Sequence, residues 1–320
     1  MENVLVVGGA GYVGGPVVDL LSENKYNVTV YDVLAYEEKY LKSVPFIYGD
    51  IRDKEKLKKI LPKYDVTIWL AAIVGDGACA ADPFLTQDIN ETSVKWLVDN
   101  YGGLIVYPST CSVYGINENL IDETALPNPI SVYAKTKLAA EQYILQKAAD
   151  RSLIFRLGTL FGLGDAFSRI RLDLVVNVLA MKAARGQKIT VFGGNQWRPL
   201  LHVKDVAEAI LMGLKANGLG LFNLSSKNVR IFEIAKAIQE IIPDCEIEKI
   251  DIKFEDQRNY KVLTEKWEDA IRIIPSKEYR TLEQGIQEII CIIKNNRIKN
   301  PDNPLYSNND YIKEQYRRWL

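Results

Sequence analysis

The stretch NVLVVGGAGYVGG, residues 3–15, decides the fold of this chain. It begins with a short, mostly apolar run that is typical of a buried strand, and Gly8, Gly11 and Gly14 follow at a spacing of three. Glycines at such a turn let the backbone approach a pyrophosphate, which binds at the N-terminus of the next helix. The residues after the turn are periodically apolar to about Lys25. The stretch therefore predicts a strand, a phosphate-binding turn and a helix.

A second apolar run, Asn27–Tyr31, leads directly into Asp32. A carboxylate at this place accepts hydrogen bonds from both adenosine ribose hydroxyls and repels a 2′-phosphate. The order of strand, turn, helix, strand and acidic residue thus favours NAD over NADP. It predicts that the cofactor contacts Gly8, Gly11, Tyr12, Val13, Gly14 and Asp32.

Further strands and helices alternate along the first half of the chain. Predicted strands lie at 44–50, 65–70, 104–107 and 153–157, and predicted helices at 54–61, 83–101 and 132–149. Strands that alternate with crossover helices form a parallel sheet covered on both faces, so the fold class is α/β with a Rossmann-type doubly wound sheet. Ligands bind at the carboxyl ends of such strands. The strand ends add Asp50, Ile51, Leu70, Ala71 and Ala72 to the predicted cofactor site.

The regular alternation of strands and helices ends after Gly158. The longer helices and short strands that follow predict a smaller, interleaved substrate lobe. We expect an NAD-binding domain at residues 1–165 to which segments at about 200–228 return. The lobe spans 166–298, and a tail spans 299–320.

Composition limits the function. The 320 residues carry 48% hydrophobic and 25% charged side chains and a net charge of −1. No basic run predicts nucleic-acid binding, and no apolar stretch reaches the ~20 residues that span a membrane. The start lacks the pattern of a signal peptide, so we expect a cytoplasmic protein. Four scattered cysteines and the single His202 predict no metal site and no Ser-His-Asp triad.

Two motifs carry groups that can do chemistry: PSTCSVYG, residues 108–115, and SVYAKTK, residues 131–137. If Ser131 caps a helix, Tyr133 and Lys137 lie on one face of its first turns. A phenol near an ammonium ionises more easily, so Tyr133 is a candidate proton acceptor for a substrate hydroxyl. The hydroxyl of Thr110 can join it.

Taken together, the motifs resemble the extended short-chain dehydrogenase/reductase family, in its nucleotide-sugar epimerase/dehydratase branch. The resemblance reaches to about Lys294 and rests on GGAGYVG, Asp32, GDIRD, Leu-Ala-Ala at 70–72, STCSVYG, YAKTK, Arg156 with the LFG turn, and RPLLHVKDVAEAI. Two positions depart from the family pattern: Trp69 replaces a frequent histidine, and Val7 replaces a threonine.

The resemblance implies NAD as cofactor, a nucleotide sugar as substrate and a homodimer paired through the helices at 83–101 and 132–149. It implies that Tyr133 takes the proton of a sugar hydroxyl, usually O4, while Lys137 holds the cofactor ribose and lowers the tyrosine pKa. Thr110 bonds the same oxygen. For the substrate, the predicted contacts are Arg198, Arg258, Phe192, Leu174 and Val175. Arg156 and His202 are interpreted as buried structural residues.

Members of this branch differ in the step that follows the oxidation of the sugar. Members that are 4,6-dehydratases carry Asp-Glu after the catalytic Thr, and this chain has Cys111 and Ser112 there. Cys111 is a candidate substrate contact and acid/base one position out of register, although a small buried side chain is the simpler interpretation. In the loop at 73–83, Asp76 or Cys79 can reach the sugar, or the loop is an ordinary surface segment.

The leading hypothesis is an NAD-dependent enzyme that oxidises C4 of a nucleotide-activated hexose or heptose, such as a GDP-heptose, for surface polysaccharide. Its net reaction is either 4-dehydrogenation or epimerisation through a 4-keto intermediate. The alternatives are a 4,6-dehydratase and a non-catalytic NAD-binding regulatory protein.

Overall fold

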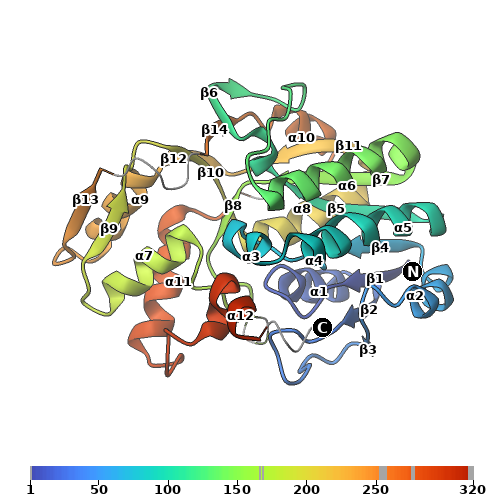
Figure 1. Cartoon of the computed structure of the whole chain (residues 1–320), viewed down its shortest axis with the longest axis horizontal. Coiled ribbons are helices and arrows are strands. Elements are labelled where there is room, and N and C mark those ends of the chain that lie inside the picture. Colours follow the sequence, from blue (N-terminus) through green and yellow to red (C-terminus); the bar gives the residue numbers. More distant parts are fainter. Residues whose placement is uncertain (1, 166, 168, 252–257, 275–277, 316–320) are drawn as a thin grey trace.

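The computed structural model describes residues 2–165, 167, 169–251, 258–274 and 278–315, so residues 316–320 of the predicted tail lie outside the described part. Its main sheet is built from β1 (Asn3–Val7), β2 (Asn27–Asp32), β3 (Phe46–Tyr48), β4 (Val66–Trp69), β5 (Leu104–Thr110), β7 (Ser152–Leu157) and β11 (Gly220–Leu224). These seven strands run parallel in the order β11-β7-β5-β4-β1-β2-β3 (Figure 1). Strand order reverses beside β1, which is the Rossmann-type arrangement. The predicted fold class is confirmed.

Both faces of the sheet are buried, and β1 shows how. Val4 and Val6 point into a core shared with α1 (Gly14–Glu23) and α8 (Val203–Ala216). Leu5 and Val7 point to the opposite core, which α2 (Lys54–Ile60), α5 (Ser93–Asn100) and α6 (Val132–Ala148) help to form. Because side chains alternate along a strand, a continuous apolar run serves two helix layers at once.

A smaller lobe has its own apolar core and lies at the left of Figure 1. Its helices are α7 (Val175–Ala184), α9 (Ile231–Ile241) and α11 (Leu282–Lys294), beside the parallel pair β9 (Ile189–Phe192) and β13 (Ile247–Ile250). A three-stranded sheet of β8 (Thr159–Phe161), β10 (Trp197–His202) and β12 (Lys227–Arg230) joins the lobe to the main sheet. Above it, β6 (Ile116–Ile121) pairs with β14 (Asn259–Val262), and α10 (Glu265–Ala270) follows.

Some elements differ from the sequence predictions. The helix predicted at 83–101 consists of α4 (Pro83–Gln87), a π-helical turn at Asp88–Thr92 and α5. The segment before it contains a short helix, α3 (Asp76–Ala81), that the sequence analysis treated as a loop. In the tail, α12 (Asn308–Gln315) lies between the main sheet domain and the lobe (Figure 1). These short elements are held by contacts with distant residues, which local patterns do not report.

The predicted cap of α6 is confirmed. The Ser131 hydroxyl accepts a hydrogen bond from the backbone N–H of Ala134 at 3.2 Å. This bond satisfies one of the free N–H groups of the first turn and sets where the helix begins. The start of α6 in turn places Tyr133 and Lys137 on its first two turns.

The backbone around Gly14 leaves no room for a side chain there, which can be tested. A Cβ at Gly14 would lie 2.6 Å from the backbone of Gly8 and Gly9, whereas a Cβ at Gly102 would have no heavy atom within 4 Å. We expect Gly14→Ala to lower the free energy of unfolding by about 2 kcal/mol, since forced backbone shifts cost that much. Gly102→Ala is the matched control. Urea denaturation measures both, and an unchanged midpoint for Gly14→Ala would contradict the expectation.

Candidate active site

One cavity of about 780 Å³ lies at the carboxyl ends of the sheet strands and extends into the lobe. It is lined by the predicted cofactor residues Gly8, Gly11, Tyr12, Val13, Gly14, Asp32, Asp50, Ile51, Leu70, Ala71 and Ala72, by Thr110, Tyr133 and Lys137, and by Leu174, Val175, Phe192, Arg198 and Arg258. Two of the predicted candidates do not line the cavity: Cys111, and Cys79, whose buried thiol donates a hydrogen bond to the backbone oxygen of Ile73 at 3.3 Å. The structure thus brings together residues that lie up to 250 positions apart, from Gly8 to Arg258.

The glycine turn fits a dinucleotide. Gly8 has φ +86°, in the left-handed region, and a Cβ on it would lie 2.5 Å from the backbone nitrogen of Ala71. The turn therefore passes directly against the segment after β4, and at Gly8 only backbone separates the turn from that segment. This is the close approach that a pyrophosphate requires.

Asp32 closes the other end of this cofactor region. Its carboxylate accepts hydrogen bonds from the backbone N–H groups of Ala10, at 3.0 Å, and Leu34, at 2.8 Å. Burial raises the pKa of Asp32, and these backbone bonds oppose the rise. The bonds fix the carboxylate at the end of β2, where it fits the ribose hydroxyls of NAD.

Asp50 follows β3 and lines the same region of the cavity. Burial acts to raise its pKa, but hydrogen bonds from Arg52, at 2.7 Å for the closest pair of atoms, lower the pKa below its ordinary value. Ile51 beside it is buried. An ionised, anchored Asp50 and an apolar Ile51 form a wall suited to a purine with polar ring atoms.

The three predicted catalytic residues meet at one place. Thr110 ends β5, and its hydroxyl accepts the backbone N–H of Ser112 at 3.1 Å. Burial raises the pKa of Tyr133, and a hydrogen bond with the Thr110 side chain lowers it only in part. Hydroxyl and phenol thus lie close enough to bind one substrate oxygen.

The charge state of the Lys137 side chain differs from the expectation. It is buried, and its ammonium nitrogen lies 3.9 Å from the ring centroid of Tyr107, a cation–π contact. Burial lowers the pKa of Lys137 to about 7. Near neutral pH, a substantial fraction of Lys137 is therefore uncharged. An uncharged Lys137 does not lower the pKa of Tyr133, so this expectation is not met by the protein alone. The positive charge of a bound nicotinamide would have to lower that pKa instead.

Cys111 points away from the cavity into a small core below β5. Its thiol donates a hydrogen bond to the backbone oxygen of Arg156 at 3.1 Å, and burial raises its pKa far above the ordinary value. The structure therefore contradicts a role for Cys111 as substrate contact or acid/base. The reason is geometric: the chain makes a 3₁₀ turn at Cys111–Tyr114, which directs this side chain to the interior.

The interpretation of Arg156 and His202 as structural residues is confirmed. Arg156 is buried and pairs with Glu141 at 2.6 Å, beneath the reaction centre. His202 is fully buried, and its Nε2 lies 2.9 Å from Glu288. Neither residue lines the cavity.

Polar residues also gather at the junction of the sheet domain and the lobe. Arg258 contacts Asp76 at 3.3 Å and the Ser112 hydroxyl at 3.2 Å. Arg198 is nearly fully buried and bonds the backbone oxygens of Trp197, at 2.8 Å, and of Arg258. Two guanidinium groups at the junction of domain and lobe favour an anionic ligand.

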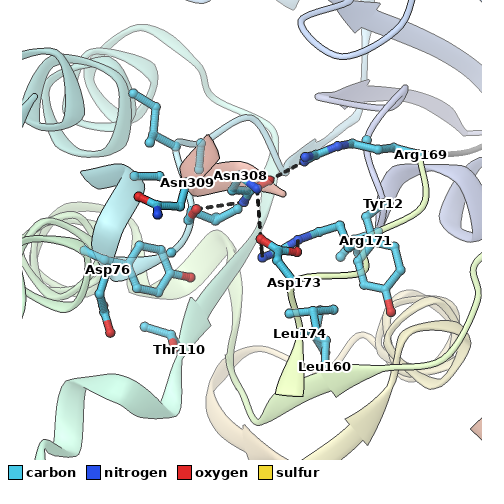
Figure 2. A pocket seen from close by; sticks show the side chains of 18 of the residues that line it. Tyr12, Asp76, Thr110, Leu160, Arg169, Arg171, Asp173, Leu174, Asn308 and Asn309 are labelled. Carbon is cyan, nitrogen blue, oxygen red and sulfur yellow. Dashed lines mark hydrogen bonds and ion pairs between the residues drawn. The ribbon is translucent and has the colours of Figure 1, made fainter. Parts of the chain in front are cut away.

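The sequence analysis missed part of the cavity wall. Arg169, Arg171 and Asp173 line the cavity, and Arg171 pairs with Asp173 through two bonds of 2.9 Å. These three charged residues alternate with apolar residues in the sequence, which was the signal that could have identified them. The tail contributes Asn308 and Asn309, for which no local signal existed. Figure 2 shows Asn308 bonded to Arg169 and to Asp173, with Asn309 beside it.

Residues 4–224 match the NAD dependent epimerase/dehydratase family, which covers more than half of the chain. The chain belongs to this family. The family recognised from the motifs is thereby confirmed, and so is the prediction of NAD as cofactor. In the described part of the chain, no helix is long and apolar enough to cross a membrane.

The chain is 32% identical over 234 residues to a putative UDP-glucose 4-epimerase of Methanocaldococcus jannaschii, covering 66% of this chain and 73% of that protein. The fold is similar to that of UDP-glucose 4-epimerase from Thermotoga maritima, solved with UDP-glucose, with TM-score 0.79 and 25% identity over 92% of this chain and 99% of that one. It is also similar to MoeE5, solved with UDP-glucuronic acid and NAD, with TM-score 0.77 and 25% identity over 90% of this chain and 97% of that one.

Because the pKa of Lys137 is lowered in the folded chain, this residue should reduce the free energy of unfolding by an amount that depends on pH. The unfolded chain holds the proton up to the ordinary pKa of 10.5, and the folded chain releases it near 7. The free energy of unfolding of the wild type therefore increases as pH rises from about 7 toward 10.5. We expect Lys137→Met to be more stable than wild type at pH 6, by at least about 1.4 kcal/mol, the equivalent of one pKa unit.

The advantage of Lys137→Met should shrink at pH 9, as measured by urea denaturation at both pH values. Lys147→Met, at an exposed position of the same helix, is the matched control and should show neither effect. A Lys137→Met variant with the same pH dependence as wild type would contradict the assignment.

The position of Cys111 gives a second test. Because the thiol faces the core, Cys111→Ala should keep the rate of product formation within about threefold of wild type, with a loss of stability of about 1 kcal/mol. Steady-state kinetics and urea denaturation measure the two effects. A loss of activity by the factor of about 100 or more that is typical of a proton-transfer residue would overturn the structural assignment.

Proposed function

We propose that this protein oxidises C4 of a nucleotide-activated hexose or heptose and acts as a 4-epimerase. The observation that carries the proposal is the meeting of Thr110, Tyr133 and Lys137 in one cavity, between the glycine turn and the arginines of the lobe. The membership of the epimerase/dehydratase family supports it. A net 4-dehydrogenase uses the same first step and is the second outcome that the experiment below separates.

The proposed cofactor contacts follow from the cavity wall. The glycine turn and the N-terminus of α1 would hold the pyrophosphate, Asp32 the adenosine ribose, and Lys137 the ribose next to the nicotinamide. When bound, NAD⁺ supplies an acceptor for the hydride that leaves C4.

Tyr133 is the proposed proton acceptor for the sugar hydroxyl. Its side chain is partly buried beside Thr110, whose hydroxyl would bond the same substrate oxygen and orient it. Because burial raises the pKa of Tyr133, the phenolate needs nearby positive charge, which the nicotinamide and a protonated Lys137 would provide. In this arrangement the tyrosine ionises only when cofactor is in place, so proton removal is coupled to cofactor binding.

Arg198 and Arg258 are the proposed contacts for the nucleotide diphosphate, with Leu174, Val175 and Phe192 around the nucleoside. Arg258 bonds Ser112 and Asp76, so it links the diphosphate region to the sugar region. The similar protein from Thermotoga maritima was solved with UDP-glucose, which supports a nucleotide sugar as the substrate class.

Cys111 and Ser112 favour epimerisation over 4,6-dehydration. The Ser112 side chain shares hydrogen bonds with Tyr260, at 3.3 Å, and Arg258, and carries no carboxylate. Cys111 faces the core. Neither residue can remove the proton at C5 as a carboxylate base would, so the chain lacks the acid/base pair of a dehydratase at these positions.

A non-catalytic NAD-binding role is less well supported. A protein that only sensed or carried NAD would have no need to keep Lys137 buried at a cost in stability. The retained pair of Tyr133 and Lys137, both on the cavity wall, favours an enzyme.

The supply of sugars such as heptoses for surface polysaccharides is the biological role we propose.

We also propose a homodimer paired through the helices that run from α4 to α6. Phe84 on α4 is 87% exposed, which is unusual for a large aromatic side chain. Light scattering of the purified protein would test this pairing.

The substrate test is a panel of UDP-, GDP- and dTDP-linked hexoses and heptoses, with products followed by NMR and mass spectrometry. An epimerase gives a product of unchanged mass and inverted C4. A dehydrogenase gives a product lighter by two hydrogen atoms together with an equivalent of NADH, and a dehydratase gives one lighter by a water molecule. The last result would contradict the proposal.

With the substrate in hand, Tyr133→Phe should lower kcat by about a thousandfold, because proton transfer contributes that order of magnitude. NAD binding should stay near that of wild type. Tyr143→Phe, on the same helix but bonded to Asp99 at the surface, is the matched control and should keep full activity. Unimpaired turnover by Tyr133→Phe would remove the basis of the proposed mechanism.

A further inference from the structure

The C-terminal helix α12 forms part of the cavity wall, which the proposed reaction does not by itself require. Asn308, Asn309 and Ile312 line the same cavity as the residues of the glycine turn. Ile312 also packs into the same apolar core as Leu5 and Val7 of β1. The helix is thus attached to the main sheet domain rather than lying loosely on it.

Asn308 bridges two segments that line the cavity. Its side-chain amide donates to the backbone oxygen of Val74 at 2.7 Å, and its backbone N–H donates to Asp173 at 2.9 Å. Its side-chain oxygen accepts from Arg169 (Figure 2). Asn308 is 1% exposed, so these bonds are largely shielded from water, which strengthens them.

A second set of contacts reaches the segment after β2, next to Asp32. The hydroxyl of Tyr311 donates to the backbone oxygen of Ala35, and its ring centroid lies 4.6 Å from that of Tyr36. The guanidinium of Arg169 lies 3.3 Å from the centroid of the Tyr36 ring. The helix therefore ties together three cavity-lining segments: the one after β2, the one after β4 and the one before α7.

Asn309, the second residue of α12, has a polar side-chain atom that forms no hydrogen bond in the described part of the chain. Its side-chain oxygen is buried and has no hydrogen-bond partner in the described part of the chain. The side chain lies against α3, since a Cβ on Gly77 would be 2.6 Å from that oxygen. A buried polar atom without a partner destabilises the protein, and because this oxygen is closed off from the empty cavity, a ligand bonds it only if the Asn309 amide turns toward the cavity that the residue lines.

We propose that Asn309 contacts the bound dinucleotide and that Asn308 positions α12 to close the route by which the dinucleotide leaves. The inference rests on the proposed function and deepens it. Release requires the three tied segments to separate, so the oxidised and reduced forms of the cofactor stay bound between the two halves of an epimerisation. A chain that must exchange its cofactor in every turnover would gain nothing from this closure.

The test measures dissociation of NADH from the full-length chain, without any sugar. Protein loaded with NADH is mixed with pyruvate and lactate dehydrogenase, which oxidise only free NADH, and the loss of bound nicotinamide fluorescence is followed. We expect Asn309→Ala to increase the dissociation rate constant about tenfold, equivalent to about 1.4 kcal/mol and to one lost hydrogen bond. Asn308→Ala should increase it by at least the same factor.

Lys313→Ala, at an exposed position of the same helix, is the matched control and should release NADH at the wild-type rate. Thermal unfolding separates closure from loss of folding: Asn309→Ala removes no hydrogen bond within the described chain and should keep the wild-type midpoint. Wild-type release rates in both asparagine variants would overturn the inference.

The two proposals fail in different ways. If the sugar panel yields a C4 epimer while the release rates are unchanged, only the role of α12 is wrong. If the variants release NADH faster but no sugar on the panel is converted, the closure by α12 stands and the proposed function is wrong.

Discussion

The architecture depends on the close approach of two backbone segments, Gly8 after β1 and Ala71 after β4. A single Cβ at Gly8 would approach within 2.5 Å of the Ala71 nitrogen. Because these segments touch, the carboxyl ends of β1 and β4 form one continuous edge of the cavity. The glycine turn, the end of β2 and the reaction centre after β5 are then arranged around that edge. A side chain at this contact would separate the cofactor region from the reaction centre.

Beneath this edge, a buried polar network holds the reaction centre rigidly. Glu141 of α6 accepts bonds from Ser109 of β5, at 2.6 Å, and from Arg156 of β7, also at 2.6 Å. Arg156 further donates to Tyr114, at 2.7 Å. Removal of one partner of such a buried pair costs more than the pair contributes, so the network fixes how α6 sits against the sheet. The relative positions of Tyr133 and Thr110 follow from that fixed packing.

The sequence was sufficient where the signals are local. The turn at Gly8–Gly14, the Ser131 cap and the spacing of Tyr133 and Lys137 each depend on neighbours a few residues away, and each lies where the pattern predicts. The direction of Cys111 depends on how a short turn packs against Arg156, and the pKa of Lys137 depends on burial by distant elements. Likewise, α12 has weak apolar periodicity and is positioned by Asp173, Val74 and Ala35. Such long-range contacts leave no trace in a window of sequence.

The late position of α12 in the sequence also determines when this helix can form during synthesis of the protein. Chains fold from the N-terminus as the ribosome extends them, and α12 is made after every other described helix and strand. The main sheet can therefore form, and the glycine turn can meet a dinucleotide, before Asn308 and Tyr311 exist. Cofactor that binds the growing chain enters through an open side, which the final residues of the described chain then cover. Cofactor that is bound before α12 packs would thus be enclosed in the last step of folding.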